Sequence, residues 1–272
     1  MGRKLFCQIS PATYRISMEK EILKRHARDF FSRETIADVK TDDLEYIVKS
    51  HFSIIRRRLE GVDMALQENK RINLAIAAEQ INGLVVYPSQ SFSFWHCVGR
   101  PTRKKGYADG LVISSGNLES DVGGGLCRLA NMIHFMVLHS PLTVTELHHH
   151  TDALFPDDRR RVPFGTGTSV LYNYIDYRFR NNTDRPFQIK VWTDKDMLLG
   201  ELRSTHELPF RYRLQEEDHH FSCEDGVMYR CSKVYRLSFD KVSGEKIGSE
   251  LILDNHSKVM YDYSLIPKEE IR

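Results

Sequence analysis

The sequence lacks the features that mark exported or membrane-spanning chains. None of its apolar runs approaches the roughly 18 consecutive residues that a helix needs to cross a bilayer. The N-terminal stretch MGRKLFCQISPATYRISMEK has no apolar run of about seven residues or more, which a secretory signal would contain. These absences predict a cytoplasmic protein without a membrane span.

Charge and cysteine content exclude further classes. Lysine and arginine (39) nearly balance aspartate and glutamate (37), so the net charge of +2 gives no electrostatic case for a nucleic-acid partner. Five cysteines, an odd number, argue against a disulfide framework and for reduced thiols. Two groups of residues could supply metal ligands: His148, His149, His150 and Asp152, and His219, His220, Cys223 and Cys231. Neither group has the short paired spacing of a zinc site, so we predict no metal and no cofactor.

The pattern along the chain predicts an α+β fold. Residues 17–35 and 41–60 look helical, and the helical pattern resumes and stops at Asn82-Gly83. Short runs rich in β-branched and aromatic residues follow, mostly strands of an antiparallel sheet on which one cysteine-bearing helix packs. We expect a helical N-terminal region (1–70), a core (71–195) and a β-rich C-terminal extension (196–272).

The stretch DVGGGLCRLANMIHFMVL sets three glycines before a cysteine that opens an apolar run. We predict a helix over about residues 126–139 with Cys127 in its first turn, where the unpaired amides and the positive dipole end lower a thiol pKa. Gly123, Gly124 and Gly125 leave room for a substrate, and their amides, with that of Cys127, are candidates for an oxyanion hole. The alternative is a buried structural cysteine at a glycine-lined helix start.

A nucleophilic cysteine needs a base within reach. The helix climbs about 20 Å, and the next segment, LTVTELHHH, returns that distance in about six residues if it is an antiparallel strand. Strand alternation then points His148 and His150 towards Cys127 and His149 away. On the predicted strand SVLYNYIDYRFR, Asp176 either orients the histidine or pairs with a nearby arginine. The order Cys, His, Asp is similar to that of papain-like and transglutaminase-like enzymes.

Five blocks in one order resemble the VanW family, which is associated with glycopeptide-antibiotic resistance clusters: NLAIAAEQINGLVVYPSQSFSFW, VGRPTRKKGYADG, DVGGGLCRL, ELHHHTD and DYRFRNNTDRPFQI. The resemblance implies that the three glycines and Cys127 match the family motif Gly-Gly-Gly-x-Cys-Gln, with Arg128 in place of the glutamine. The family's histidine motif is matched by Glu146, His148, His150 and Thr151. An aspartate common in the family is Gly167 here, whereas a later one is kept as Asp176.

The resemblance implies a link to L,D-transpeptidation of peptidoglycan, to which VanW-type domains in some exported proteins are tied. Our first hypothesis is a cysteine acyltransferase or amidohydrolase acting on a peptidoglycan-related peptide, with Cys127 as nucleophile, His148 or His150 as base and Asp176 as orienter. Arg128 would meet a substrate carboxylate. The second hypothesis is a non-catalytic binding or accessory protein on a degenerate enzyme fold, which Arg128 and Gly167 favour.

Overall fold

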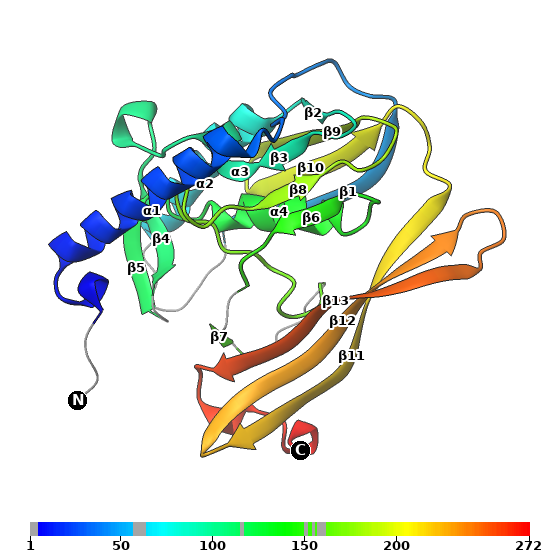
Figure 1. Ribbon diagram of the computed structural model, residues 1–272. Helices are drawn as coiled ribbons and strands as arrows, with labels where there is room; N and C mark the ends of the chain where they lie inside the picture. Colours follow the sequence, from blue (N-terminus) through cyan, green and yellow to red (C-terminus); the bar gives the residue numbers. More distant parts are fainter. Residues whose placement is uncertain (1–4, 57–63, 115–116, 150–151, 154–155, 157–161) are drawn as a thin grey trace.

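The computed structural model describes residues 5–56, 64–114, 117–149, 152–153, 156 and 162–272. Helices lie mostly in the first half of the chain: α1 (Pro11–Ser32), α2 (Met64–Ile81), α3 (Phe94–Val98), α4 (Cys127–Val137) and the single turns η1 (Phe6–Gln8), η2 (Arg103–Lys105), η3 (Tyr263–Leu265) and η4 (Lys268–Glu270). Figure 1 shows a helix-covered core with a long twisted sheet attached to it.

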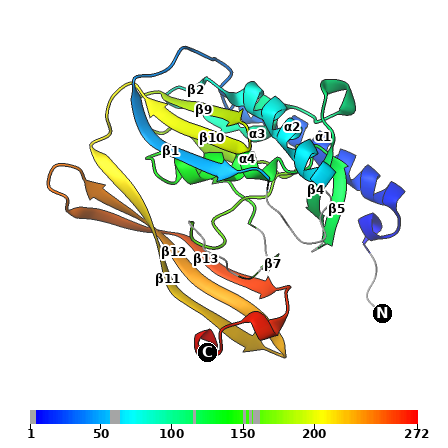
Figure 2. The same ribbon diagram turned by 180° about the vertical axis from the view of Figure 1, so that it is seen from behind.

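The core is built on an antiparallel sheet in the order β1 (Tyr46–Ile54), β10 (Met197–Ser204), β9 (Phe187–Asp194), β2 (Leu84–Val86). Figure 2 shows these four strands side by side. All three predicted parts of the chain contribute strands to this sheet. Helix α4 packs closely on β10, because a Cβ atom on Gly200 would lie only 2.9 Å from the sulfur of Met132.

Two smaller sheets complete the core. One joins β3 (Ser91–Ser93), β8 (Arg178–Arg180) and β6 (Thr143–Glu146), and the other is the hairpin of β4 (Asp109–Ser114) and β5 (Asn117–Val122). Fully buried apolar side chains from α2, α4 and the sheets fill the space between these elements, among them Leu74, Ile81, Leu129, Phe179 and Ile189. The predicted α+β class with antiparallel sheets is confirmed.

The C-terminal sheet has its own small apolar cluster. It contains the long antiparallel strands β11 (Phe210–Glu224), β12 (Val227–Asp240) and β13 (Lys246–Val259), to which β7 (Asp152–Ala153) pairs in parallel. Buried and half-buried positions alternate along β12, as a strand with one covered face requires. Four buried side chains form the cluster: Phe221, Met228, Val259 and Ile266.

The expected helix over residues 41–60 is wrong, because residues 46–54 of this segment form strand β1, and residues 57–60 lie outside the described residues. Its acids and its Thr41 imitate a helix start, but Tyr46, Ile47 and Val48 favour a strand, and pairing with β10 over the whole length of β1 decides the structure. The helices expected before and after it are confirmed as α1 and α2. The described residues include no helix with both the length and the apolar content that a bilayer span requires.

Candidate functional site

A cleft of about 1570 Å³ lies over the N-terminal end of α4. Its walls come from α1, the glycine loop before α4 (residues 123–126), the hairpin of β4 and β5, and the segment 162–175. We call it the Cys127 cleft. Side chains that line it include Arg15, Ile22, Trp95, Cys127, Arg128 and Tyr172.

Cys127 is the first residue of α4, as predicted. Its half-buried thiol donates to the carbonyl oxygen of Val170, with a sulfur–oxygen distance of 3.7 Å. Burial raises the pKa of the Cys127 thiol, so the prediction of a lowered pKa is wrong. The helix dipole favours the thiolate, but the loss of water around the sulfur has the larger effect. Burial therefore favours the neutral thiol over the thiolate at Cys127.

The glycines before Cys127 are explained by close packing. A Cβ atom on Gly124 would lie 2.1 Å from the backbone carbonyl of Gly110, a distance that no side chain can take. Gly125 has a φ of 95°, and a Cβ atom there would lie 2.6 Å from Cγ of Lys70. The loop before α4 thus runs directly against its neighbours, where side chains do not fit.

Asn73, which sequence reasoning missed as a site residue, fixes this loop from α2. Its buried side-chain amide donates to the carbonyl oxygens of Ala108 and Gly124, both at 3.0 Å, and its Oδ1 accepts from the amide of Ala108 at 2.8 Å. A buried asparagine with three hydrogen bonds holds two chain segments in a fixed relation. Its place at the start of the block NLAIAAEQ was the available signal.

The predicted oxyanion hole is only partly available. The amides of Gly123 and Gly124 donate to the carbonyls of Ala108 and Asp121, both at 3.0 Å, so these two amides do not face a ligand. Within the described ranges, the amides of Gly125, Leu126 and Cys127 donate to no backbone carbonyl. These three residues line the cleft. The start of α4 can therefore offer three amides to an anion.

The predicted pair of Cys127 and His148 is not formed. The His148 ring bonds through Nε2 to Oε1 of Glu146 at 2.9 Å, and its backbone carbonyl accepts from the amide of Ser169 at 2.7 Å. His148 is not among the residues that line the cleft. No hydrogen bond joins the two side chains in the part of the chain that the structure describes. Strand β6 ends at Glu146 after a break in register, so the alternation that aimed His148 at Cys127 does not continue that far. His150 lies outside the described residues.

Asp176 also has other partners than those of a catalytic orienter. Its fully buried carboxylate accepts from the hydroxyl of Ser93 at 2.6 Å, from Nε of Arg178 at 2.8 Å, and from the amides of Trp95 and Tyr177 at 3.1 and 2.9 Å. Four donors occupy both oxygens, so Asp176 does not orient the His148 ring.

The predicted strand containing Asp176 is likewise wrong, because a turn interrupts it. Leu171 and Ile175 close the turn with two backbone hydrogen bonds, and Asn173 has a φ of 52°. Strand β8 begins only at Arg178. Asp176 therefore lies in the loop before β8. Its carboxylate accepts from the amide of Trp95 and so fixes the start of α3.

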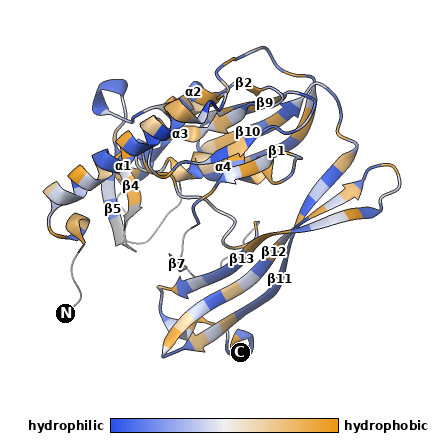
Figure 3. Cartoon of the chain, viewed as in Figure 1, coloured by the Kyte–Doolittle hydropathy of each residue, from blue (hydrophilic) through white to orange (hydrophobic). Residues whose placement is uncertain are grey.

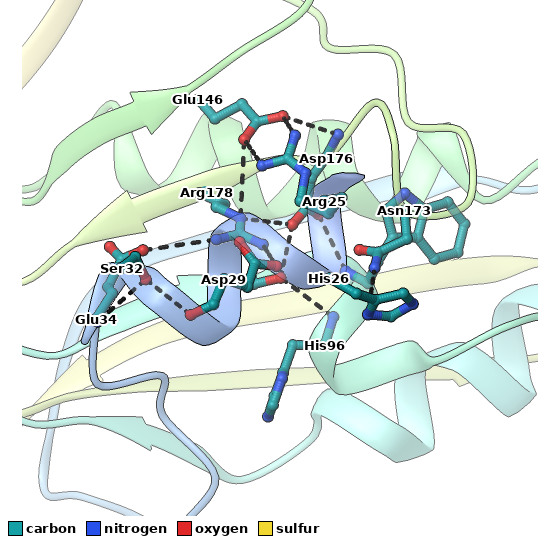
Figure 4. Close-up of polar contacts among 12 residues, drawn as sticks. Arg25, His26, Asp29, Ser32, Glu34, His96, Glu146, Asn173, Asp176 and Arg178 are labelled. Carbon is teal, nitrogen blue, oxygen red and sulfur yellow. Dashed lines mark hydrogen bonds and ion pairs between the residues drawn. The ribbon is translucent and has the colours of Figure 1, made fainter. Parts of the chain in front are cut away.

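A network of buried ion pairs, also missed from the sequence, ties α1 to the core (Figure 4). Arg25, which is 4% exposed, makes two parallel hydrogen bonds to Glu146, and Arg178 bonds to Asp29 of α1 at 2.7 Å. Burial pushes the pKa of Glu146 upwards, but the hydrogen bonds from Arg25 and His148 outweigh it and lower this pKa. The motif histidine thus belongs to a charge network that positions α1 along the cleft.

Basic and aromatic side chains give the cleft its chemistry. The Arg128 guanidinium donates to the hydroxyl of Ser53. Arg100 stacks over the ring of Tyr172 at 5.5 Å, and that ring meets Trp95 edge-on with the centroids 5.6 Å apart. Apolar faces beside arginines suit a ligand with a small apolar body and a carboxylate. Among the described residues no group of three or more His, Cys, Asp or Glu side chains is placed to hold a metal ion.

Comparison with known proteins finds one family. A sequence model of the family described as VanW like protein matches residues 69–203. The chain is 32% identical over 201 residues to the Vancomycin B-type resistance protein VanW of Enterococcus faecalis, a match that covers 74% of this chain and 73% of that protein. It is 32% identical over 119 residues to the uncharacterized protein YoaR of Bacillus subtilis, covering 44% of this chain and 38% of that protein. No solved structure matches the chain.

Proposed function

The chain belongs to the VanW family, and from that premise we propose that it binds a peptidoglycan-related peptide with a free carboxylate in the Cys127 cleft, in a role linked to glycopeptide resistance. The link to resistance comes from the name of the relative in Enterococcus faecalis. The observation that carries the proposal is the start of α4, where the amides of Gly125, Leu126 and Cys127 line the cleft without a backbone acceptor among the described residues.

Different parts of the cleft suit different parts of such a peptide. Backbone amides at a helix start bind a carboxylate through hydrogen bonds and through the helix dipole. Arg128, the next residue, lines the same cleft and adds a cation. Trp95 and Tyr172 line it as well and offer apolar surface to the short side chains of such a peptide. The cytoplasmic location expected from the sequence stays a prediction, and a peptidoglycan precursor is the ligand consistent with it.

Binding without turnover is the function that this arrangement favours. Two of the side chains expected to activate Cys127 have other partners, because His148 bonds to Glu146 and Asp176 accepts from Arg178, and His150 lies outside the described residues. Burial also raises the pKa of the thiol. A cysteine in this state fits the wall of a binding site better than it fits an activated nucleophile.

The test is calorimetric titration with an acyl-D-alanyl-D-alanine peptide and with the same peptide amidated at its C-terminus. We expect the free acid to bind at least about tenfold more tightly, the effect of one charge-assisted hydrogen bond. Arg128→Gln should weaken binding of the acid by about the same factor and leave the amide unaffected. Arg185→Gln, in a loop outside the cleft where Arg185 pairs with Asp184, is the matched control. Equal affinity for the two peptides would contradict the proposal.

A second candidate function is cysteine acyl transfer of the L,D-transpeptidase or amidase type, favoured by the position of the Cys127 sulfur beside the three amides in the cleft. The sulfur would attack the peptide carbonyl, the thiol proton would pass to the leaving amine, and an incoming amine or water would release the acyl group from the thioester. The order Cys, His, Asp along the chain is similar to that of papain-like and transglutaminase-like enzymes, and the amides would hold the oxyanion.

Mass spectrometry separates the two candidates. Incubation with a tetrapeptide ending in D-alanine would add the acyl mass to Cys127 and release D-alanine if transfer occurs. Binding without turnover predicts an unchanged protein mass together with measurable affinity. Cys127→Ala should then still bind the peptide, whereas an enzyme would lose all release of D-alanine.

A further inference from the structure

Helix α1 has one face that is buried against the core and one that is exposed. Its inner face is buried at Ile22 and Arg25, and it lines the Cys127 cleft. Its outer face exposes Ile16, Leu23 and Phe30 at 60%, 69% and 81%. These three residues are spaced by seven, so at about 100° per residue they fall within about 40° of one another in a single stripe. We call this the α1 apolar stripe.

The stripe extends at both ends of the helix. Phe31 beside it is 78% exposed, and the turn η1 and the residue before it expose Phe6 and Leu5 at 55% and 63%. Figure 3 shows hydrophobic positions along α1 and η1 between hydrophilic ones. Large apolar side chains exposed singly are ordinary on a protein surface, but a row along a whole helix marks a docking surface.

Basic side chains follow one edge of the stripe. Lys20 and Lys24 are 64% and 61% exposed, and Arg28 is exposed one turn further on. Most acids of α1 are directed elsewhere, because Glu19 pairs with Arg100 and Asp29 pairs with Arg178. Glu21 is the exception, since it pairs with Lys24 at 2.8 Å and with Lys20 at 3.7 Å. The outer face of α1 therefore has net positive charge beside its apolar residues.

We infer that this face docks α1 onto an anionic lipid bilayer, lying in the plane of the interface. An amphipathic helix with aromatic and aliphatic residues on one side and lysines beside them inserts its apolar face between lipid headgroups, while the lysines meet the phosphates. The charge complementarity with an anionic surface favours a bilayer over a protein groove. Docking in this way would hold the Cys127 cleft, which the other face of α1 lines, beside the membrane surface.

Vesicle co-sedimentation of the full chain tests the inference. One set of vesicles is phosphatidylcholine alone, and the other has equal parts of phosphatidylcholine and phosphatidylglycerol. We expect binding at least about tenfold stronger to the anionic set, since each basic side chain near such a surface strengthens binding about fivefold. Lys20→Gln with Lys24→Gln should weaken it by about 25-fold on the same basis. Leu23→Glu should weaken it at least as much.

Val242→Glu is the matched control, because Val242 is 97% exposed in the turn between β12 and β13, far along the chain from α1. It should bind vesicles like the unchanged protein, and melting curves should show all variants folded. Phe30→Trp adds a direct readout, because the indole fluorescence of this variant should shift to the blue on the anionic vesicles.

Three results would overturn the inference that the stripe docks onto an anionic bilayer. They are equal binding to both vesicle sets, a loss of binding in Val242→Glu equal to that in Leu23→Glu, and an unshifted fluorescence spectrum of the Phe30→Trp variant. Peptide titration of Leu23→Glu in solution tests the cleft separately, since Leu23 does not line it.

Discussion

Replacing Glu146 by glutamine should weaken the attachment of α1 to the core and lower the free energy of unfolding. Glu146 is 18% exposed at its side chain and makes two hydrogen bonds to Arg25, which is 5% exposed there. Arg178 lies 3.8 Å away on the other side. Removing the negative charge leaves buried arginine without its counter-charge, which costs about 3 to 5 kcal/mol in comparable pairs. Because glutamine keeps one acceptor, we expect the lower end, about 3 kcal/mol.

Urea denaturation of four proteins measures this effect: the unchanged chain, Glu146→Gln, Arg25→Met and the double variant. The double variant should cost about 2 kcal/mol less than the sum of the single ones, because the two side chains interact directly. Glu19→Gln is the control on the same helix. Its pair with Arg100 is about half exposed, so its loss should cost less than about 1 kcal/mol.

The same measurement across pH gives a second check. The folded-state pKa of Glu146 lies below the ordinary value of 4.5, so its contribution to stability is present above that pH and is lost as the pH falls through the folded value. In Glu146→Gln this part of the acid sensitivity should disappear. A cost below about 1 kcal/mol for Glu146→Gln, or additive costs in the double variant, would refute the reasoning.

Three further predictions concern the site. Iodoacetamide should label the exposed Cys223 before Cys127 at neutral pH. Labelling of Cys127 should increase with pH, because burial raises the pKa of its thiol. A mass-spectrometric map in which Cys127 is labelled fastest near pH 6 would contradict this. Gly124→Ala should lower the free energy of unfolding by about 3 kcal/mol in urea denaturation, because the new methyl group meets the Gly110 backbone. Gly226→Ala is the control: it has open space around it, so only its φ of 78° should cost stability, and the loss should be smaller. Equal losses would contradict the packing argument. Asp176→Asn should lower thermal stability by breaking the Arg178 pair, and peptide affinity that falls without any loss of stability would instead place Asp176 in contact with ligand.

The sequence predicts local features of this fold well. The helical pattern and the stop at Gly83 identify α2, and the glycine run correctly locates Cys127 at the start of α4. It fails where the outcome depends on distant partners. Strand β1 resembles a helix until β10 pairs with it, and the turn at Asn173 breaks a run whose pattern is that of a continuous strand.

The sequence misplaces His148 and Asp176 relative to Cys127 for a related reason. The predicted geometry assumed that alternation continues unbroken from β6 to His148, but a break in register after Val144 ends it. The true partner of this region, Arg25, lies 121 positions from Glu146 in the chain, and no local pattern indicates that pairing. The motif residues Glu146 and Asp176 were recognised, whereas their roles depended on contacts that only the folded chain shows.

The central claim is that the start of α4 receives the carboxylate of a peptide in the Cys127 cleft. Amide chemical shifts in a ¹⁵N-labelled protein test it most directly, because they report hydrogen bonding at individual residues. Titration with the acyl-D-alanyl-D-alanine peptide should shift the resonances of Gly125, Leu126 and Cys127 downfield and leave those of Gly123 and Gly124, whose amides already donate to backbone carbonyls, nearly in place. Unchanged resonances at Gly125, Leu126 and Cys127 in the presence of saturating peptide would contradict the account.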